Sequence, residues 1–198
     1  MRDLYRSLGE LLGYPDGALR DRAYRCLELA ASLRPQAAGL IEEFAMLVQT
    51  KPSGALEETY TAAFDLNPDC CPYVGYQLVG EDPRRATFML ELQERYRAAG
   101  FDHGKELPDH LAVILRFLGH QADPAMEHTL VEDALLPALQ KMIPSLPESH
   151  PYRKLLQATA AALTTSGANG GSAKSTMESW EHPRLPIEHI PTGDEASV

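Results

Sequence analysis

The sequence predicts an all-α fold, a single helical bundle of about seven to nine helices followed by a disordered C-terminal tail. Leucine, alanine and aromatic residues recur every three or four positions through most of residues 1–165, which is the period of an amphipathic helix. β-Branched residues are few, and no alternating run of the kind that forms a strand persists. The chain of 198 residues is long enough to bury one core.

Four helices are predicted in the first third of the chain. Leucines give residues 2–12 one apolar face, and residues 17–33 form a second helix. This second helix ends at Arg34, because a residue that precedes proline is pushed out of the helical region. The apolar face of a third helix runs from Leu40 to Val48, and a fourth helix ends at Asp65.

An irregular segment, residues 65–82, follows the fourth helix. Pro83 suits the first turn of the next helix, where its missing N–H costs nothing, and Pro108 is expected to begin another. Pro137 falls inside an apolar helical pattern, so it should kink or split that helix. The later predicted helices span residues 83–99, 108–118, 125–142 and 149–165.

The chain is predicted to divide into a helical domain, residues 1–165, and a flexible linker with a tail of low order, residues 166–198. Glycine, serine and alanine dominate residues 166–176 without apolar spacing, which is typical of a linker. Apolar residues beyond it, such as Trp180 and Ile187, stand among prolines. Such a tail is expected to be disordered alone, with apolar side chains able to dock on the core or on a partner.

Composition excludes several classes of function. A net charge of −10 disfavours binding to nucleic acid or to an anionic membrane and favours a basic partner. The N-terminus has no secretion signal, no apolar run is long enough to span a bilayer, and three cysteines make no disulfide framework. We therefore expect a soluble, cytoplasmic protein that inserts into no membrane.

Catalytic and metal motifs find little support. The sequence contains no G-x-S-x-G, no phosphate-binding glycine loop and no H-E-x-x-H, so we predict that the protein is not an enzyme. Cys70 and Cys71 with His103 and His110 suggest a metal site, but adjacent cysteines do not easily share one tetrahedral ion. We expect no stably bound cofactor or metal, and keep a metal- or cofactor-binding helical protein as the alternative.

The segment from Tyr60 to His110 is richer in aromatic residues, acids, prolines and glycines than its surroundings. Long loops of this composition are often functional. The residues Pro108, Asp109 and His110 also have a structural explanation, since proline and aspartate favour the first turn of a helix. On that explanation His110 lies beside the positive helix end, which favours its neutral ring. Both explanations remain open at this point.

Four elements of this segment carry a resemblance to a known family. They are Tyr60-x-x-x-Phe64-Asp65-Leu66, Tyr73-x-x-Tyr76, Gly80-Glu81-Asp82 and Glu106-Leu107-Pro108-Asp109-His110-Leu111. Together they resemble the NarJ branch of the TorD/DmsD-type redox-enzyme maturation chaperones, over about residues 1–165. The chain departs from the family at Arg85-Ala86, where many relatives have Arg-Gly, and at Cys70-Cys71, so the client stays open.

The resemblance implies a cytoplasmic assembly chaperone. Such a chaperone binds the apo catalytic subunit of a nitrate-reductase-like molybdoenzyme, through a basic N-terminal leader, and holds it for insertion of the bis(molybdopterin guanine dinucleotide) molybdenum cofactor. A subunit retained in the mature enzyme is a further alternative. The expected mode is an apolar helix in a groove with its cations near acids. The predicted client-binding residues are Asp65, Tyr73, Tyr76, Glu81, Glu106, Pro108, Asp109 and His110.

Overall fold

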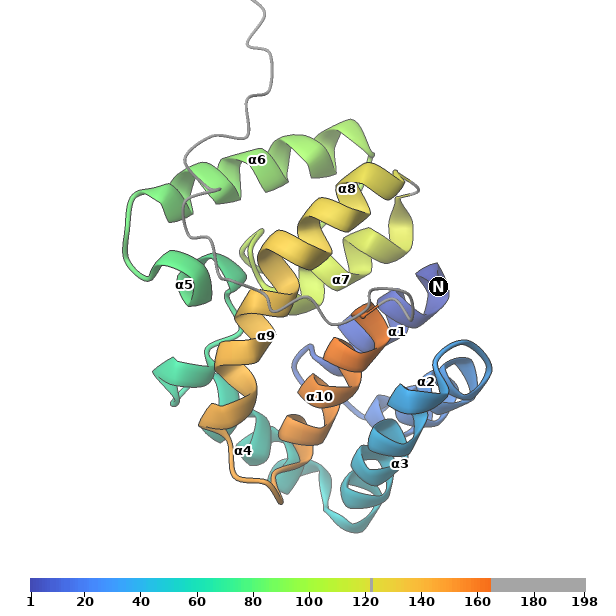
Figure 1. Cartoon of the computed structure of the whole chain (residues 1–198). Helices are drawn as coiled ribbons and strands as arrows, with labels where there is room; N and C mark the ends of the chain where they lie inside the picture. Colours follow the sequence, from blue (N-terminus) through green and yellow to red (C-terminus); the bar gives the residue numbers. More distant parts are fainter. Residues whose placement is uncertain (122, 165–198) are drawn as a thin grey trace, which may run out of the picture. The chain divides into compact units, whose positions relative to one another are not determined.

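The computed structural model describes residues 1–121 and 123–164, which are almost wholly helical (Figure 1). The α-helices are α1 (Arg2–Leu11), α2 (Leu19–Leu33), α3 (Pro35–Thr50), α4 (Ser53–Phe64), α5 (Val74–Val79), α6 (Arg84–Ala98), α7 (Leu111–His120), α8 (Pro124–Thr129), α9 (Leu136–Met142) and α10 (Pro151–Leu163). Short 3-10 turns, η1 (Pro68–Cys70) and η3 (Ile143–Ser145), and a π-helical segment, η2 (Leu130–Leu135), complete the order.

The predicted fold class is confirmed. With the continuous run from α8 to α9 taken as one helix, the described residues form nine helices. Their only extended pairing is an isolated bridge between Tyr73 and His110. The described residues belong to one compact unit, Met1–Thr165, and the predicted tail, residues 166–198, lies outside the described residues. No helix in the described part of the chain is both long and apolar enough to cross a membrane.

Two expectations about helix positions were wrong. The segment 65–82, predicted to be irregular, contains η1 and α5. The helix predicted to begin at Pro108 begins at Leu111 instead, with His110 as its N-cap residue. The reason is that Pro108 and Asp109 form a turn, closed by a hydrogen bond from the amide of His110 to the carbonyl oxygen of Leu107, and His110 is extended and pairs with the segment before α5.

Pro137 was predicted to kink or split its helix, and the structure shows a change of helical register there, while the run from α8 to α9 stays helical throughout. Pro137 is the second residue of α9, which directly follows the π-helical segment Leu130–Leu135. A proline nitrogen cannot donate to the carbonyl four residues earlier, so the hydrogen-bond register changes before it.

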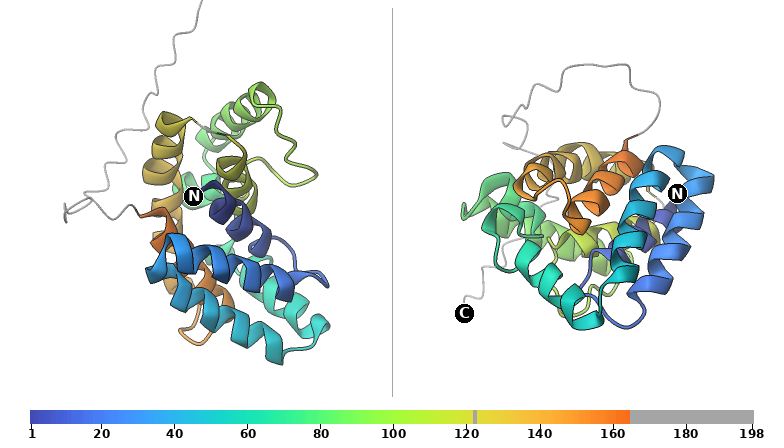
Figure 2. Two further views of the ribbon diagram at one scale, coloured as in Figure 1. Left: turned by 90° about the vertical axis from the view of Figure 1, so that its right-hand side faces the viewer. Right: turned by 90° about the horizontal axis from the view of Figure 1, so that it is seen from below.

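The centre of the core is the crossing of α1 on α7, which depends on two glycines. A Cβ atom on Gly9 would lie 2.7 Å from the carbonyl oxygen of Ala112, and one on Gly119 would lie 2.8 Å from that of Arg2. Such contacts are too short for real Cβ atoms, so glycine permits the close approach. Figure 2 shows α1 lying against α7, with α2 and α3 side by side.

A second part of the core is aromatic and lies where α10 packs on α3 and α4. The ring of Tyr152 meets those of Phe44, Tyr60 and Phe64 at centroid distances of 5.6, 5.5 and 5.0 Å. Tilted and edge-on contacts of this kind are the preferred geometry of aromatic pairs. They fix the end of α4, from which Asp65 follows.

We expect Gly9→Ala to destabilise the fold by about 1–3 kcal/mol, because the added methyl group meets backbone atoms of α7 that cannot move aside. Gly39→Ala is the matched control, since Gly39 lies within α3 and has nothing within 4 Å of an added Cβ. That control should be neutral or gain up to about 1 kcal/mol from helix propensity. Urea unfolding of both variants checks this, and equal stabilities would show that the crossing is not tightly packed.

Candidate functional site

Two backbone hydrogen bonds join the segment before α5 to the segment before α7. The amide of Val74 donates to the carbonyl oxygen of Asp109 at 2.8 Å, and the amide of Leu111 donates to that of Pro72 at 2.7 Å. These bonds form the antiparallel bridge between Tyr73 and His110. The aromatic motif and the Pro-Asp-His motif are therefore neighbours in space, although they are distant in the sequence.

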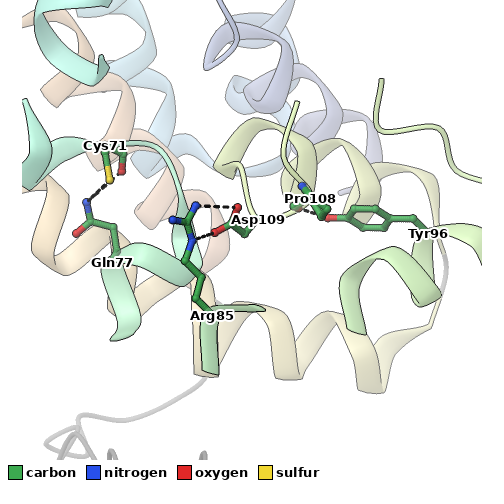
Figure 3. Close-up of polar contacts among 6 residues, drawn as sticks. All are labelled: Cys71, Gln77, Arg85, Tyr96, Pro108 and Asp109. Atoms are coloured by element: carbon green, nitrogen blue, oxygen red, sulfur yellow. Dashed lines mark hydrogen bonds and ion pairs between the residues drawn. The ribbon is translucent and has the colours of Figure 1, made fainter. Parts of the chain in front are cut away.

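A buried ion pair joins the same region to α6 (Figure 3). The Nε atom of Arg85 donates to Oδ2 of Asp109 at 2.9 Å, and Nη2 donates to Oδ1 at 3.5 Å. The Asp109 side chain is fully buried and that of Arg85 is 18% exposed. Asp109 thus holds α6 in place, which differs from both the helix-dipole role and the client-facing role considered for it from the sequence.

Gly75 makes room for this ion pair. A Cβ atom at Gly75 would lie 2.9 Å from Oδ2 of Asp109 and 3.0 Å from Cγ of Arg85. The backbone of α5 can pass this close to the charged groups only without a side chain at this position.

Pro108 and the two adjacent cysteines are also held by internal contacts (Figure 3). The buried hydroxyl of Tyr96 donates to the carbonyl oxygen of Pro108 at 2.8 Å. Nε2 of Gln77 donates to the carbonyl oxygen of Cys71 at 3.0 Å.

Burial raises the pKa of the Cys70 thiol to about 11 and also raises that of Cys71, which disfavours the thiolate that a metal needs. The described residues bring no three His, Cys, Asp or Glu side chains into a metal-binding group.

His110 caps α7 with its side chain. Its Nδ1 atom accepts a hydrogen bond from the amide of Ala112 at 3.1 Å, which leaves the proton of the neutral ring on Nε2. Burial, with a smaller contribution from the nearby charge of Arg116, lowers the pKa of His110 to about 4. The expected neutral ring is therefore confirmed, but its main cause is burial rather than the positive end of the helix.

A pocket of about 540 Å³ opens beside this bridge, between the end of α1, the end of α4 and the start of α7. We call it the α1–α7 pocket. Its lining residues are Gly9, Glu10, Gly13, Tyr14, Asp16, Arg22, Tyr60, Asp65, Pro72, Tyr73, Glu106, His110, Ala112, Val113 and Arg116.

The structure brings four of the eight predicted client-binding residues together in this pocket: Asp65, Tyr73, Glu106 and His110. The other four do not line it. Tyr76 lies against the guanidinium of Arg85, Glu81 is exposed after α5, and Pro108 and Asp109 are buried behind the bridge. A role in client binding stays a prediction for all eight.

The charges of the α1–α7 pocket are unevenly paired. Asp16 forms an ion pair with Arg22 at 2.7 Å, whereas Glu10, Asp65 and Glu106 have no ion-pair partner among residues 1–121 and 123–164. Burial raises the pKa of Tyr73, and the carboxylates of Glu106, Asp109 and Asp65 raise it further. Arg116 also lines the pocket and likewise has no ion-pair partner in the described part of the chain, but the three carboxylates outnumber it. Net negative charge therefore gathers beside an aromatic wall, an arrangement that attracts cations.

Sequence reasoning missed the side of this pocket formed by α1, α2 and α7. Glu10, Tyr14 and Arg116 lie in or beside ordinary apolar helical patterns, and only the crossing of α1 on α7 brings them together. Tyr14 carried a weak signal, because it is an aromatic residue in a turn between Gly13 and Pro15.

Asp109→Asn should cost about 2–3 kcal/mol of folding stability, because it leaves the largely buried guanidinium of Arg85 without its counter-ion. Asp82→Asn is the control, because it removes the charge of Asp82, which forms an exposed ion pair with Arg84. This change should leave the free energy of unfolding nearly unchanged. Chemical denaturation of both variants makes the comparison. A cost for Asp109→Asn no greater than that of the control would mean that the ion pair does not stabilise the fold.

The pKa of His110 predicts a pH dependence of stability. In the unfolded chain His110 has an ordinary pKa near 6.5 and binds a proton below that pH. In the folded chain His110 stays neutral down to about pH 4. Stability should therefore fall as the pH falls from about 6.5 to 4, by up to about 3 kcal/mol from this group.

His110→Asn isolates this contribution, because asparagine is a good N-cap residue without a titrating group. The variant should lose stability less steeply than the wild type over the same pH range in thermal unfolding. His150, whose pKa burial also lowers, titrates in both proteins and cancels in the difference. Identical slopes would show that His110 is accessible to protons in the folded protein.

Comparison with known proteins identifies the family. The chain matches no curated protein sequence. A family model described as nitrate reductase delta subunit matches residues 28–146, more than half of the chain. The match runs from within α2 to the end of η3 and contains the bridge, the buried ion pair and the α7 side of the pocket, whereas α1 precedes it. The chain belongs to the nitrate reductase delta subunit family, the NarJ-type branch of the redox-enzyme maturation chaperones.

Proposed function

We propose that this chain is a cytoplasmic chaperone for the apo catalytic subunit of a nitrate-reductase-like molybdoenzyme. It binds the subunit through a basic N-terminal leader and holds it until the bis(molybdopterin guanine dinucleotide) molybdenum cofactor is inserted. In this proposal the cofactor belongs to the client, and the chain itself catalyses no reaction. Membership of the nitrate reductase delta subunit family supports the class of client.

The observation that carries the proposal is the α1–α7 pocket. It combines the three carboxylates without ion-pair partners, Glu10, Asp65 and Glu106, with the rings of Tyr60 and Tyr73. A lysine or arginine side chain of the leader would meet both a negative charge and an aromatic face there. Charges of this kind accelerate encounter and select the partner more than they add affinity.

Exposed apolar side chains beside the pocket suit the apolar part of such a leader. Tyr14 lines the pocket and is 58% exposed, while Leu66 and Leu107, which are 76% and 44% exposed, directly follow the pocket residues Asp65 and Glu106. Burying a large apolar side chain contributes roughly 1.5–3 kcal/mol. A helix with one apolar face and cations at its edge would cover these residues in the helix-in-groove mode.

A subunit retained in the mature enzyme is the second candidate, and the description of the family as a delta subunit favours it. The two functions differ in what remains bound after maturation. A chaperone should be absent from the purified active, cofactor-loaded enzyme. A structural subunit would instead co-purify in a constant molar ratio to the catalytic subunit.

We expect binding of the leader to weaken with salt. The probe is a synthetic peptide with the basic N-terminal segment of a nitrate reductase catalytic subunit, titrated by calorimetry at low and high ionic strength. Exposed charges are screened over about 8 Å at physiological ionic strength. Glu106→Gln should weaken binding about 2- to 5-fold at low salt, and the difference from the wild type should vanish at high salt.

Glu94→Gln is the matched control, because it removes the same charge from an exposed position on α6 away from the pocket. Its effect on affinity should be small at every salt concentration. Binding that is independent of salt, or equal losses in the two variants, would mean that apolar docking alone recognises the leader.

A further inference from the structure

We infer that Arg85 is a positioning residue for client binding, which fixes the ring of Tyr73 as a wall of the α1–α7 pocket. Arg85 does not itself line the pocket. The inference rests on the proposed function, because it concerns the affinity of the same pocket for its client.

The guanidinium of Arg85 makes two kinds of contact at once. Its Nε atom donates to the buried carboxylate of Asp109 at 2.9 Å, and its central carbon lies 5.3 Å from the centroid of the Tyr73 ring. The Tyr73 ring also meets the ring of His110 edge-on, at a centroid distance of 5.6 Å and an interplanar angle of 85°. Tyr73 is thus held by a cation and by an imidazole, both anchored on the segment before α7.

This double role requires the shape of arginine. A guanidinium can pair in its plane with a carboxylate while its face lies on an aromatic ring, whereas the compact ammonium of lysine does one or the other. A second ring, that of Tyr76, lies 5.8 Å from the same guanidinium. The absence of a side chain on Gly75 leaves space for Arg85 and Asp109 to meet.

Fixing Tyr73 has a direct consequence for binding. The side chain is only half-buried, so without Arg85 it would sample several rotamers in the free protein. Binding of a client would then have to order the ring, which costs conformational entropy. Arg85 removes this cost because it holds the ring in place before the client binds. Arg85 therefore contributes to client affinity through Tyr73, without touching the client.

A double-mutant cycle tests this chain of contacts. The affinity of the full-length chain for the leader peptide is measured for the wild type, Arg85→Gln, Tyr73→Leu and the double variant, each checked for folding by circular dichroism. We expect Arg85→Gln to weaken binding about 3- to 10-fold. In the Tyr73→Leu background the same change should have little further effect, because the ring through which Arg85 acts is gone.

Arg97→Gln is the matched control, since it removes an equal charge from an exposed position at the other end of α6, and it should bind the peptide like the wild type. If Arg85→Gln does not fold, Arg85→Lys takes its place in the cycle, because lysine retains a charge for Asp109. The lysine variant should show a smaller loss of affinity that likewise disappears without Tyr73.

Three results would overturn the inference. An equal loss with and without Tyr73 would mean that Arg85 contacts the client or supports the fold in general. If Arg85→Gln binds the peptide like the wild type while Tyr73→Leu binds it more weakly, Arg85 has no part in binding, and the proposed function stays intact. A wild-type chain that binds neither the peptide nor the apo catalytic subunit would overturn the proposed function together with the inference.

Discussion

The buried ion pair between Arg85 and Asp109 is the constraint on which the arrangement around the pocket depends. A carboxylate with no exposure to solvent is tolerated only beside a well-placed counter-charge. This requirement fixes the start of α6 against the segment that precedes α7, and it leaves no room for a side chain at Gly75. The carbonyl of the same Asp109 pairs with the amide of Val74, so one residue orders α5, α6 and the entry to α7 together.

Much of the fold could be predicted from the sequence because apolar spacing has the period of a helix. The long helices α2, α3 and α6 present one apolar face each, and their ends carry local signals such as Pro35. The short helix α5 could not be found in this way, since six residues with a glycine among them present no full apolar face. The start of α7 was misplaced because Pro108 and Asp109 have the local chemistry of a first helical turn. In the structure they form a separate turn, and the long-range backbone pairing of Asp109 and Leu111 with the segment before α5 delays the helix to Leu111.

The candidate site was predicted only in part, for a related reason. Composition indicated a functional segment, and four of its residues do meet in one pocket. Local patterns cannot show whether a charged side chain faces solvent or a buried partner. Asp109 and Glu106 look alike in the sequence, yet one is enclosed by Arg85 and the other is exposed at the pocket. The contributions of Glu10, Tyr14 and Arg116 depend on a helix crossing that no local pattern encodes.

The close packing of α1 on α7 also has a consequence for the order in which the protein is made. The carbonyl oxygen of Gly119 accepts a hydrogen bond from Arg6, 113 positions earlier in the chain. During synthesis α1 leaves the ribosome first and can pack on α2, but α7 follows only after much of the domain has been translated. The part of the apolar face of α1 that α7 covers therefore stays exposed until then. The pocket has walls from both helices and is therefore completed late. On the proposed function, a nascent chain would therefore gain its binding pocket only when its own folding is nearly finished.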